Sequence, residues 1–568
     1  MRLRIRDGAA VADAAMPAAL LLGAWNNICI ELSPDGADVT VGHHRLRLET
    51  SVTMRPGDPL HWTLARVPWR SEDSAGHASL DGKIANVEVS WRDQGQAVAR
   101  HRWDFAPAAN RAVVPPLTPQ TEPLVLHQAP TRAVTGPHWT GETHHWPDAP
   151  GQWDAIHFHR DDLEDAGWPV ATTFALGADL PTGVYGIRLK GERNDDVVPF
   201  VVGSAHGARK PEVRVLLPTM TYLAYANEPI FEPHVPLHRG WWDDWAERLG
   251  LLSLYNWHAD GSGVSLASTR RPLLNMRPDH RYWLTGAPHG LSLDLQLLKW
   301  LQTIGFDAGL LTDHELDADP DAALDGTRVL VTGSHPEYWT RRMMTAMERF
   351  LGKGGRLAYL GGNGFAAMVG VDRERPHLLE LRRRASLPGL WDASPGELGL
   401  ATTGEVGGYW RHHSPSPRSM TGLDSAGMGF TTARPYRRTT ESDDPACAFV
   451  FDGVTARVFG ERSAVLGAAG GYEVDSVDFK RGTPSDTRVL ATAAGFDSAY
   501  VGLDQSGIVR SDVVLRMLRT GGAVFGVGSI AWCGSLGGSH CDVNIERVTE
   551  NVLRRFADPT PFLGSEGL

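Results

Sequence analysis

Six short apolar runs after residue 212 alternate with segments of helical periodicity, and this alternation constrains the fold more than any other feature. Apolar residues at helical spacing predict one helix around 293–304 and another around 545–556. Strands that alternate with helices form largely parallel sheets, so we expect an α/β domain over residues 212–560 with helices on both faces. Its Gly- and Pro-rich region, about 365–485, is expected to be an insertion of strands and loops over the sheet edge. The predicted strands are residues 213–217, 308–311, 329–332, 357–360, 489–493 and 523–527.

The segment RVLVTGSHPEYW, residues 328–339, ends one of these strands in polar side chains. A β-branched run gives way to a Gly-Ser turn, and His335 and Glu337 follow directly. Apolar residues then recur at helical spacing, with Thr340 placed to cap a helix. The carboxyl ends of strands in α/β proteins line the crevice where ligands bind, which makes both side chains candidate site residues. The alternative is structural, with His335 in a turn and Glu337 favouring a helix N-terminus.

A second predicted strand, 357–360, also ends in glycines and a polar residue. It runs into GGNGF at 361–365, where the glycines allow the backbone to approach a ligand. Asn363 offers an amide that both donates and accepts hydrogen bonds. If the two strands are neighbours, Asn363 converges with His335 and Glu337 on one crevice. A purely structural turn is the alternative.

Two tyrosines and one more carboxylate occupy loops expected near the same edge. Tyr225 lies in PTMTYLAYANEP (218–229), and Tyr255 lies in LLSLYNWHADGSG (251–263). Aromatic residues in such loops usually pack, so spacing alone makes neither a ligand. Glu473 follows a Gly-rich turn, where a carboxylate is normally solvated or bonded to the turn.

No nucleophile motif accompanies these residues. The chain contains no G-x-S-x-G elbow, no phosphate-binding P-loop and no HExxH motif. A hydrolase built from this set would therefore activate water with a metal ion or a general base, and would not form an acyl-enzyme.

Two β-rich regions precede the α/β region. Residues 1–105 show period-two apolar patterning with frequent turns, which predicts an all-β sandwich or jelly roll. Residues 106–205 begin with a Pro- and Ala-rich linker and have the strand spacing of an immunoglobulin-like sandwich. Two histidines of this second region would share one face of a strand and could bind a metal, although packing is the alternative. The candidate ligands there are His157, His159, Asp161 and Asp162.

The chain has 568 residues, which suggests about three domains. Its composition excludes several functional classes. The formal charge of −12 gives no basic footprint for nucleic acid. No stretch of about 18 apolar residues could span a membrane. The apolar segment 14–24 follows Asp7 and Asp13, unlike a signal peptide, so we expect a cytoplasmic protein. The four cysteines make no disulfide framework, and Cys533 and Cys541 fit buried thiols better than a zinc site.

Seven segments occur in a specific order: HFHRDDLEDAGW, LPTGVYGIRL, TYLAYANE, SLYNW, TGSHPEYW, LGGNGF and GYEVDSVD. Together they closely resemble the N,N-dimethylformamidase large (beta) subunit family. The resemblance runs from about residue 124 to the C-terminus, and the first β region looks like the family's lectin-like module. It implies a catalytic domain similar to a class I glutamine amidotransferase that lacks the cysteine nucleophile.

The same resemblance implies a mononuclear Fe(III) site. Tyr225 and Tyr255 would be its phenolate ligands and Glu337 its carboxylate ligand. Tyr222 is close enough in sequence to Tyr225 to be the alternative first ligand. Fe(III) is a hard Lewis acid, which suits an all-oxygen set of donors.

The catalytic residues implied by the resemblance are Glu473, His335 and Asn363. Glu473 would be the general base, while the other two would orient the substrate or stabilise the oxyanion. The expected protein is an iron-dependent amidohydrolase, acting on the carbon–nitrogen bond of a small or N-substituted linear amide by metal-activated water. The Trp-rich segment 240–245, expected to be a loop, and the insertion would line its pocket. We expect a homo-oligomer, with or without a small accessory subunit, that binds neither nucleic acid nor membrane.

Two other functions remain open at this point. The first is a non-catalytic carbohydrate- or protein-binding protein that uses its β domains, with a degenerate amidotransferase-like scaffold. The second is a zinc or other metal hydrolase that uses His157 and His159, which is less favoured because these residues belong to a different domain.

Overall fold

The chain divides into two units, residues 1–80 and residues 81–568. No helix among the described residues is long and apolar enough to cross a membrane. Parts of the apolar segment 14–24 and of the predicted linker lie outside the described residues. The structure, a computed structural model, describes residues 2–7, 10–15, 23–33, 36–49, 64–65, 80–93, 96–106, 112–177, 179–192, 195–204, 210–228, 238–384, 390–503 and 509–562.

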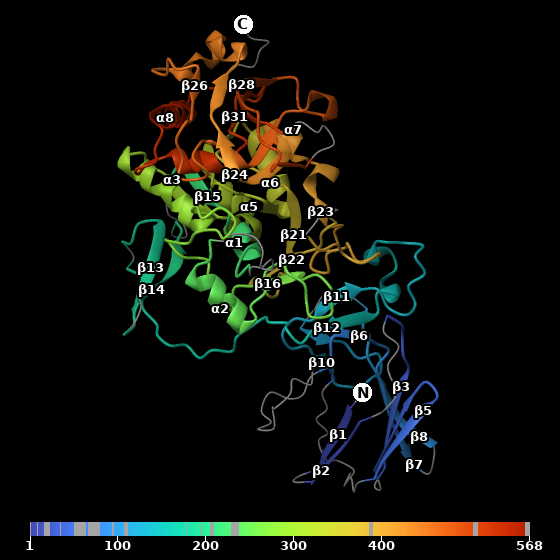
Figure 1. Cartoon of the computed structure of the whole chain (residues 1–568). Helices are drawn as coiled ribbons and strands as arrows, with labels where there is room; N and C mark the ends of the chain where they lie inside the picture. Colours follow the sequence, from blue (N-terminus) through green and yellow to red (C-terminus); the bar gives the residue numbers. More distant parts are fainter. Residues whose placement is uncertain are drawn as a thin grey trace. The chain divides into compact units, whose positions relative to one another are not determined.

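A nine-stranded mixed sheet organises the second unit (Figure 1). Its strand order is β17-β15-β18-β20-β31-β30-β28-β25-β26. All six predicted strands belong to it, each within two residues of its expected bounds. The strands are β15 (Val213–Leu217), β17 (Gly309–Thr312), β18 (Val329–Thr332), β20 (Arg356–Tyr359), β25 (Tyr436–Arg438), β26 (Val458–Phe459), β28 (Thr487–Ala493), β30 (Ser511–Met517) and β31 (Ala523–Gly526).

The sheet is parallel over only part of its width. Neighbours from β17 to β31 are parallel, whereas β30, β28, β25 and β26 continue it in antiparallel pairs. The region 365–485 supplies the edge strand β26 and its neighbour β25. Tyr436 and Phe459 on these strands are buried and stack on each other. Tyr436 also meets Trp532 edge-on, which fixes this region to the core of the sheet.

The two helices predicted from periodicity are confirmed, as is the helix after Thr340. The Thr340 hydroxyl oxygen accepts a hydrogen bond from the N–H of Met343 at 3.2 Å and caps α6, as predicted. The expected Trp-rich loop at 240–245 was wrong, because Asp243 accepts from the N–H of Gly240 and starts helix α2 there. The helices are α1 (Thr219–Ala224), α2 (Trp241–Leu249), α3 (Leu291–Thr303), α4 (Asp313–Ala318), α5 (Pro320–Leu324), α6 (Arg341–Gly352), α7 (Pro417–Thr421) and α8 (Val543–Ala557).

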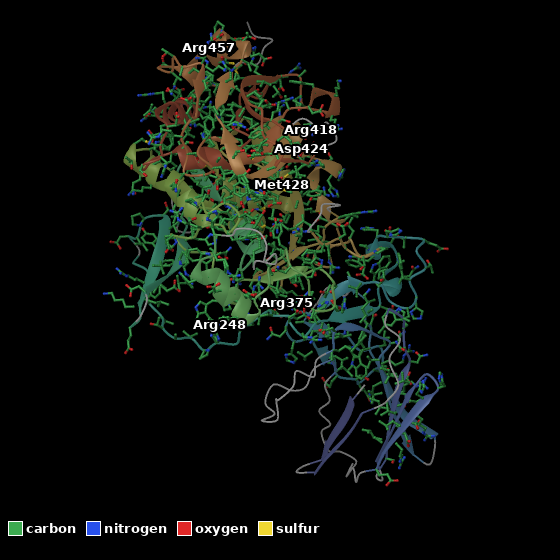
Figure 2. The ribbon with its side chains drawn as sticks, viewed as in Figure 1. Arg248, Arg375, Arg418, Asp424, Met428 and Arg457 are labelled. Atoms are coloured by element: carbon green, nitrogen blue, oxygen red, sulfur yellow. The ribbon has the colours of Figure 1, made fainter. Side chains whose placement is uncertain are left out.

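The second unit also contains two smaller sheets, whose strands are interspersed along the chain with those of the main sheet. One is five-stranded and contains β16, β22, β21, β19 and β23; the other has the order β27-β24-β29. Strand β24 begins at Asp424, which pairs with Arg418 at 2.7 Å (Figure 2). The strands are β16 (Leu266–Ser268), β19 (Tyr338–Trp339), β21 (Ala367–Val371), β22 (Leu378–Leu381), β23 (Gly408–Tyr409), β24 (Asp424–Arg434), β27 (Gly470–Ser476) and β29 (Val501–Gly502).

The described residues of 81–204 form several small sheets, and an immunoglobulin-like sandwich over 106–205 stays a prediction. The three-stranded sheet β11-β12-β6 and the pairs β7-β8, β10-β9 and β13-β14 are separate. Strands β6 to β8 were expected in the first domain but belong to the second unit. The strands are β6 (Gly82–Ala85), β7 (Glu88–Asp93), β8 (Gln96–Arg102), β9 (Val113–Val114), β10 (Leu124–Val125), β11 (Thr131–Val134), β12 (Ala155–Phe158), β13 (Gly183–Lys190) and β14 (Asp195–Val202).

Two tryptophans attach this region to a distant segment of the same unit. Trp153 is fully buried, and its indole N–H donates to the carbonyl of Gly396 at 2.8 Å. The indole of Trp146 donates to the carbonyl of Leu400 at 3.0 Å. Both tryptophans therefore have their indole N–H groups satisfied by residues 396–400.

The first unit is all-β in the residues described. It contains the hairpin β1-β2 and a three-stranded antiparallel sheet in which β4 lies between β3 and β5. These strands agree with the predicted period-two pattern, while a lectin-like sandwich stays a prediction. They are β1 (Arg2–Asp7), β2 (Ala10–Ala15), β3 (Ile28–Ser33), β4 (Gly36–Val41) and β5 (His44–Glu49).

Candidate metal and catalytic site

Glu337 lies at the centre of the candidate site, in the turn that follows the carboxyl end of β18. Its backbone N–H donates to the hydroxyl of Thr221 at 3.1 Å. Its carbonyl accepts from the N–H groups of Ala366 and Ala367 at 2.9 and 3.1 Å. Two neighbouring segments of the fold therefore fix the backbone of Glu337, a residue that is only 6% exposed.

Two tyrosine hydroxyls meet one oxygen of Glu337. Tyr225, which ends helix α1, donates to Glu337 Oε2 at 2.9 Å, and Tyr255 donates to the same oxygen at 3.3 Å. Tyr255 lies in a turn in which Asn256 Oδ1 accepts from both the N–H and the hydroxyl of Ser253. Three oxygen atoms from three separate segments therefore converge on one point.

His335 is fully buried between two carboxylates. Its Nε2 lies 3.3 Å from Glu337 Oε2 and 3.2 Å from Glu473 Oε2, but is out of line for a hydrogen bond with either. Its Nδ1 also has no hydrogen-bond partner among the described residues. Buried polar groups are nearly always paired, so an imidazole in this state marks a place where an added group could bind.

Glu473 faces this group from a different sheet. It lies on β27 opposite Met428 of β24, a residue labelled in Figure 2. Asn363 Nδ2 donates to Glu473 Oε2 at 2.6 Å, and Asn363 Oδ1 accepts from the hydroxyl of Ser425. Both ends of the Asn363 side-chain amide are thus hydrogen-bonded, and in this structure the amide positions Glu473. The second oxygen of Glu473 has no hydrogen bond with any residue that the structure describes.

A buried carboxylate that sequence reasoning missed, Asp475, fixes the turn that carries Asn363. Asp475 accepts from the backbone N–H of Asn363 at 2.8 Å and from the hydroxyl of Tyr359. Asn363 has a φ of +47°, a left-handed conformation that needs such support. Burial raises the pKa of Asp475 to about 7. The available signal was the E-V-D alternation, which places Glu473 and Asp475 on one face of a strand.

Tyr338 and Arg383 were also missed. The hydroxyls of Tyr338 and Tyr255 share a hydrogen bond, and the Arg383 guanidinium lies 4.5 Å from the centroid of the Tyr255 ring. Arg383 also donates to the Tyr338 hydroxyl at 3.4 Å. Tyr338 could have been suspected because it directly follows Glu337, whereas nothing local marks Arg383.

The protonation of this group follows from burial and close charge. Burial, and then the Glu337 carboxylate, raise the pKa of both Tyr225 and Tyr255 well above that of free phenol. Burial raises the pKa of Glu337 to about 7, against the effect of His335. Burial acts to lower the pKa of His335, but Glu473 and Glu337 outweigh it, and the net pKa is raised.

The two candidate tyrosines of the TYLAYANE segment have different partners. The Tyr222 hydroxyl donates to Asp294, whose other oxygen accepts from the N–H of Ser334 at 2.6 Å. Only Tyr225 of this pair contacts Glu337 in the part of the chain that the structure describes.

Other sequence candidates lie apart from this site. Cys533 is buried, and its thiol contacts the carbonyl of Leu360 at 3.1 Å, as expected of a buried thiol. His157 and His159 lie at the end of β12, outside the main sheet.

Residues 131–544 match the sequence profile of a family described as N,N-dimethylformamidase beta subunit-like, C-terminal. The chain belongs to this family. The matched residues include every member of the site described above, from Tyr225 to Glu473.

Two relatives extend this family assignment. The N,N-dimethylformamidase beta subunit of Paracoccus aminophilus is 34% identical over 463 residues, which is 76% of this chain and 60% of the relative. The N,N-dimethylformamidase beta subunit of an Alcaligenes species is 32% identical over 457 residues, again 76% and 60%. The chain thus spans about 60% of the length of these relatives. A ThuA-like protein from Bacteroides uniformis aligns structurally with 48% of the chain and 89% of its own, at 12% identity and a TM-score of 0.27, too low to assign a fold.

Proposed function

We propose that the chain is an Fe(III)-dependent amidohydrolase that cleaves the C–N bond of a small or N-substituted amide to a carboxylic acid and an amine. The observation that carries the proposal is the convergence of three oxygens, from Tyr225, Tyr255 and Glu337, beside a second buried carboxylate, Glu473. The family and the names of the two relatives support an amide as substrate.

Tyr225, Tyr255 and Glu337 would hold the ferric ion. Both hydroxyls lie within 3.3 Å of Glu337 Oε2, so the three oxygens already occupy neighbouring corners of one small site. Phenolate and carboxylate oxygens are hard donors, which suits Fe(III). The unsatisfied nitrogens of His335 add a polar group that faces the same point.

The donor set also requires a strong cation. Burial keeps the phenols of Tyr225 and Tyr255 protonated, so two phenolates in this place need a high positive charge beside them. Arg383 supplies a further fixed positive charge next to Tyr255. When bound, the ferric ion would serve as a Lewis acid toward the amide carbonyl and water.

Glu473 would act as the general base. It would take a proton from the attacking water as the C–O bond forms, and return it to the nitrogen as the C–N bond breaks. Asn363 holds one oxygen of this carboxylate at 2.6 Å, which leaves the other to take the proton. His335 lies between both carboxylates, where it would donate to the developing oxyanion, an effect typically of about 3–4 kcal/mol.

A small cavity with room for about one water molecule lies beside Tyr225. Its walls include the aromatic rings of Trp242, Tyr282 and Trp283 and the half-buried Glu228. Polar side chains complete the lining, namely Asn227, Asp243, Asn275 and His280. The amide panel in the test below therefore includes both primary and N-alkylated amides.

The geometry favours this function over a binding protein with a degenerate scaffold. Two carboxylates and an imidazole buried at one point are costly, and such clusters are typical of catalytic sites. Because both named relatives are beta subunits, we also propose that the chain assembles with further subunits.

The test compares the full-length wild type with Glu337→Gln and Glu473→Gln. Iron is measured by elemental analysis and by the visible tyrosinate-to-iron charge-transfer band, and amine release is measured over a panel of amides. We expect a coloured wild type that contains iron. Glu337→Gln should lose the iron, whereas Glu473→Gln should keep it and release amine about 10²- to 10⁴-fold more slowly.

A colourless, metal-free wild type that still hydrolyses amides would overturn the iron assignment. Full occupancy by zinc would assign a different metal. Normal turnover in an iron-loaded Glu473→Gln variant would remove Glu473 from the reaction.

A further inference from the structure

A second group of metal-binding residue types lies where β12 meets a loop of the α/β region (Figure 1). The loop is a hairpin over residues 256–264, closed by a bridge between Trp257 and Gly263. We call the group the His159 cluster. Its members are His157, His159, Asp162, His258, Asp260 and Ser262.

Three side-chain atoms of this cluster converge. His157 Nε2 lies 2.8 Å from Asp260 Oδ2, and His159 Nε2 lies 3.9 Å from the same oxygen. The two histidine rings are 4.1 Å apart between centroids, because they project from the same side of the chain two residues apart. Separations of about 3 to 4 Å between donor atoms are those that a tetrahedral ion with bonds of about 2 Å spans.

The opposite atom of two of these side chains is already occupied. His159 Nδ1 lies 3.1 Å from Asp162 Oδ1, so this nitrogen is engaged and Nε2 is the nitrogen that faces Asp260. Asp260 Oδ1 accepts from both the N–H and the hydroxyl of Ser262, at 2.9 and 2.6 Å. A histidine that binds a metal through one ring nitrogen usually has a carboxylate hydrogen-bonded to its other ring nitrogen.

The donor atoms also contact one another within the protein. His159 Nε2 lies 3.0 Å from the Ser262 hydroxyl, which donates to Asp260 Oδ1, and His157 Nε2 shares a hydrogen bond of 2.8 Å with Asp260 Oδ2. A cation bound at the three donor atoms would take the place of these contacts.

The charges of the neighbourhood point the same way. Asp161, Asp162 and Asp260 make no ion pair with lysine or arginine anywhere in the described ranges, and each contacts a histidine.

His258 supports the cluster but is not placed to be a ligand. Its ring stacks on that of His159 at 3.6 Å with an angle of 4°, so the nitrogens of the two rings do not point at one ion. Its Nδ1 is also engaged by Asp161 at 2.6 Å.

We propose that His157 Nε2, His159 Nε2 and Asp260 Oδ2 bind a divalent transition-metal ion of the zinc type. Imidazole and carboxylate donors suit this class, and three protein ligands leave a position for water. The ion would join β12 to the tip of the hairpin whose base carries Tyr255, and the site neither contains nor depends on the residues of the proposed amidohydrolase site.

The test uses full-length, tag-free protein with its own iron left in place. Each variant is equilibrated with Zn²⁺, dialysed, and analysed for zinc and iron, and its thermal unfolding midpoint is recorded. His157→Ala and Asp260→Asn remove ligands whose side chains are 13% and 20% exposed, so neither leaves a large internal cavity. His138→Ala is the matched control, because His138 pairs with Asp154 at 2.7 Å in the same region but outside the cluster.

We expect the wild type and His138→Ala to keep one zinc per chain and to unfold at a higher temperature with zinc than without it. His157→Ala and Asp260→Asn should bind zinc at least about tenfold more weakly and lose this shift, while iron content stays unchanged. Equal zinc retention in all four proteins, or none in the wild type, overturns the proposal. If zinc instead of iron occupied the proposed amidohydrolase site, that zinc would remain in His157→Ala. The measurement therefore distinguishes a wrong metal at the amidohydrolase site from the absence of a metal at the His159 cluster.

Discussion

Replacing Tyr225 by phenylalanine, with Tyr222→Phe as its matched control, tests the proposed iron site most sharply. The two residues are neighbours on one short helix, both are buried, and each hydroxyl donates to a buried carboxylate. Only the partner differs, since Tyr225 meets Glu337 whereas Tyr222 meets Asp294. The pair therefore separates loss of a metal ligand from loss of a hydrogen bond.

Typical energies of hydrogen bonds and metal ligands give the expected size of both effects. A hydrogen bond to a charged group contributes about 1.5–3 kcal/mol, so both variants should be destabilised by similar amounts. Loss of a group behind a ligand typically weakens metal binding 10- to 100-fold, and loss of a direct ligand should exceed this. For Tyr225→Phe we expect iron retention to weaken by at least about 100-fold, equivalent to about 2.7 kcal/mol.

The assay dialyses wild type and both variants against a chelator, then measures iron per chain, the charge-transfer absorbance and the unfolding midpoint. Tyr225→Phe should lose iron and colour, while Tyr222→Phe keeps both with a similar drop in midpoint. If Tyr225→Phe kept its iron and its band, Tyr225 would not be a ligand. If Tyr222→Phe lost both while still folded, the ligand assignment within this helix would be reversed.

Three further changes probe the supports of the fold and site. Ser425→Ala frees the amide of Asn363, so amine release should fall about tenfold at unchanged iron content, and loss of iron would contradict a positioning role. Glu397→Gln should cost about 3 kcal/mol at pH 7 because it leaves Lys83 without its buried partner. Burial acts to raise the pKa of Glu397, but Lys83 lowers it by more, so the net pKa lies below the usual 4.5 of a glutamate. This stability is present above pH 4.5 and is lost as pH falls through the folded pKa, so the two midpoints should merge in acid; a constant gap would refute the pairing. Thr340→Ala should lose about 1 kcal/mol in denaturant unfolding, and no change would mean that the cap is not needed.

The features that the sequence predicted well have a local physical cause. A β-branched run followed by glycine marks a buried strand, and Thr340 followed by helical spacing marks a helix start. The sequence also predicted that His335, Glu337 and Asn363 would converge if their two strands were neighbours. Strands β18 and β20 do pair in parallel, and Glu473, whose place was not predicted, contacts both His335 and Asn363.

The features that the sequence did not predict depend on distant contacts. Strands β25 and β26 are two to three residues long and carry no readable period, so their place in the main sheet could not be inferred. The partners of Trp146 and Trp153 are about 250 residues away in the chain. Ser425 and Arg383 reach the site from segments that have no motif of their own.

The tryptophan contacts with residues 396–400 have a consequence for protein engineering. The stretch 205–211 separates the β-rich sequence from the α/β sequence, and a designer would choose it as the cut for moving the catalytic part into another protein. Such a cut would strip Trp146 and Trp153 from the carbonyls they bond and expose a patch that now excludes water. The transplantable piece must therefore carry the β-rich sequence with it.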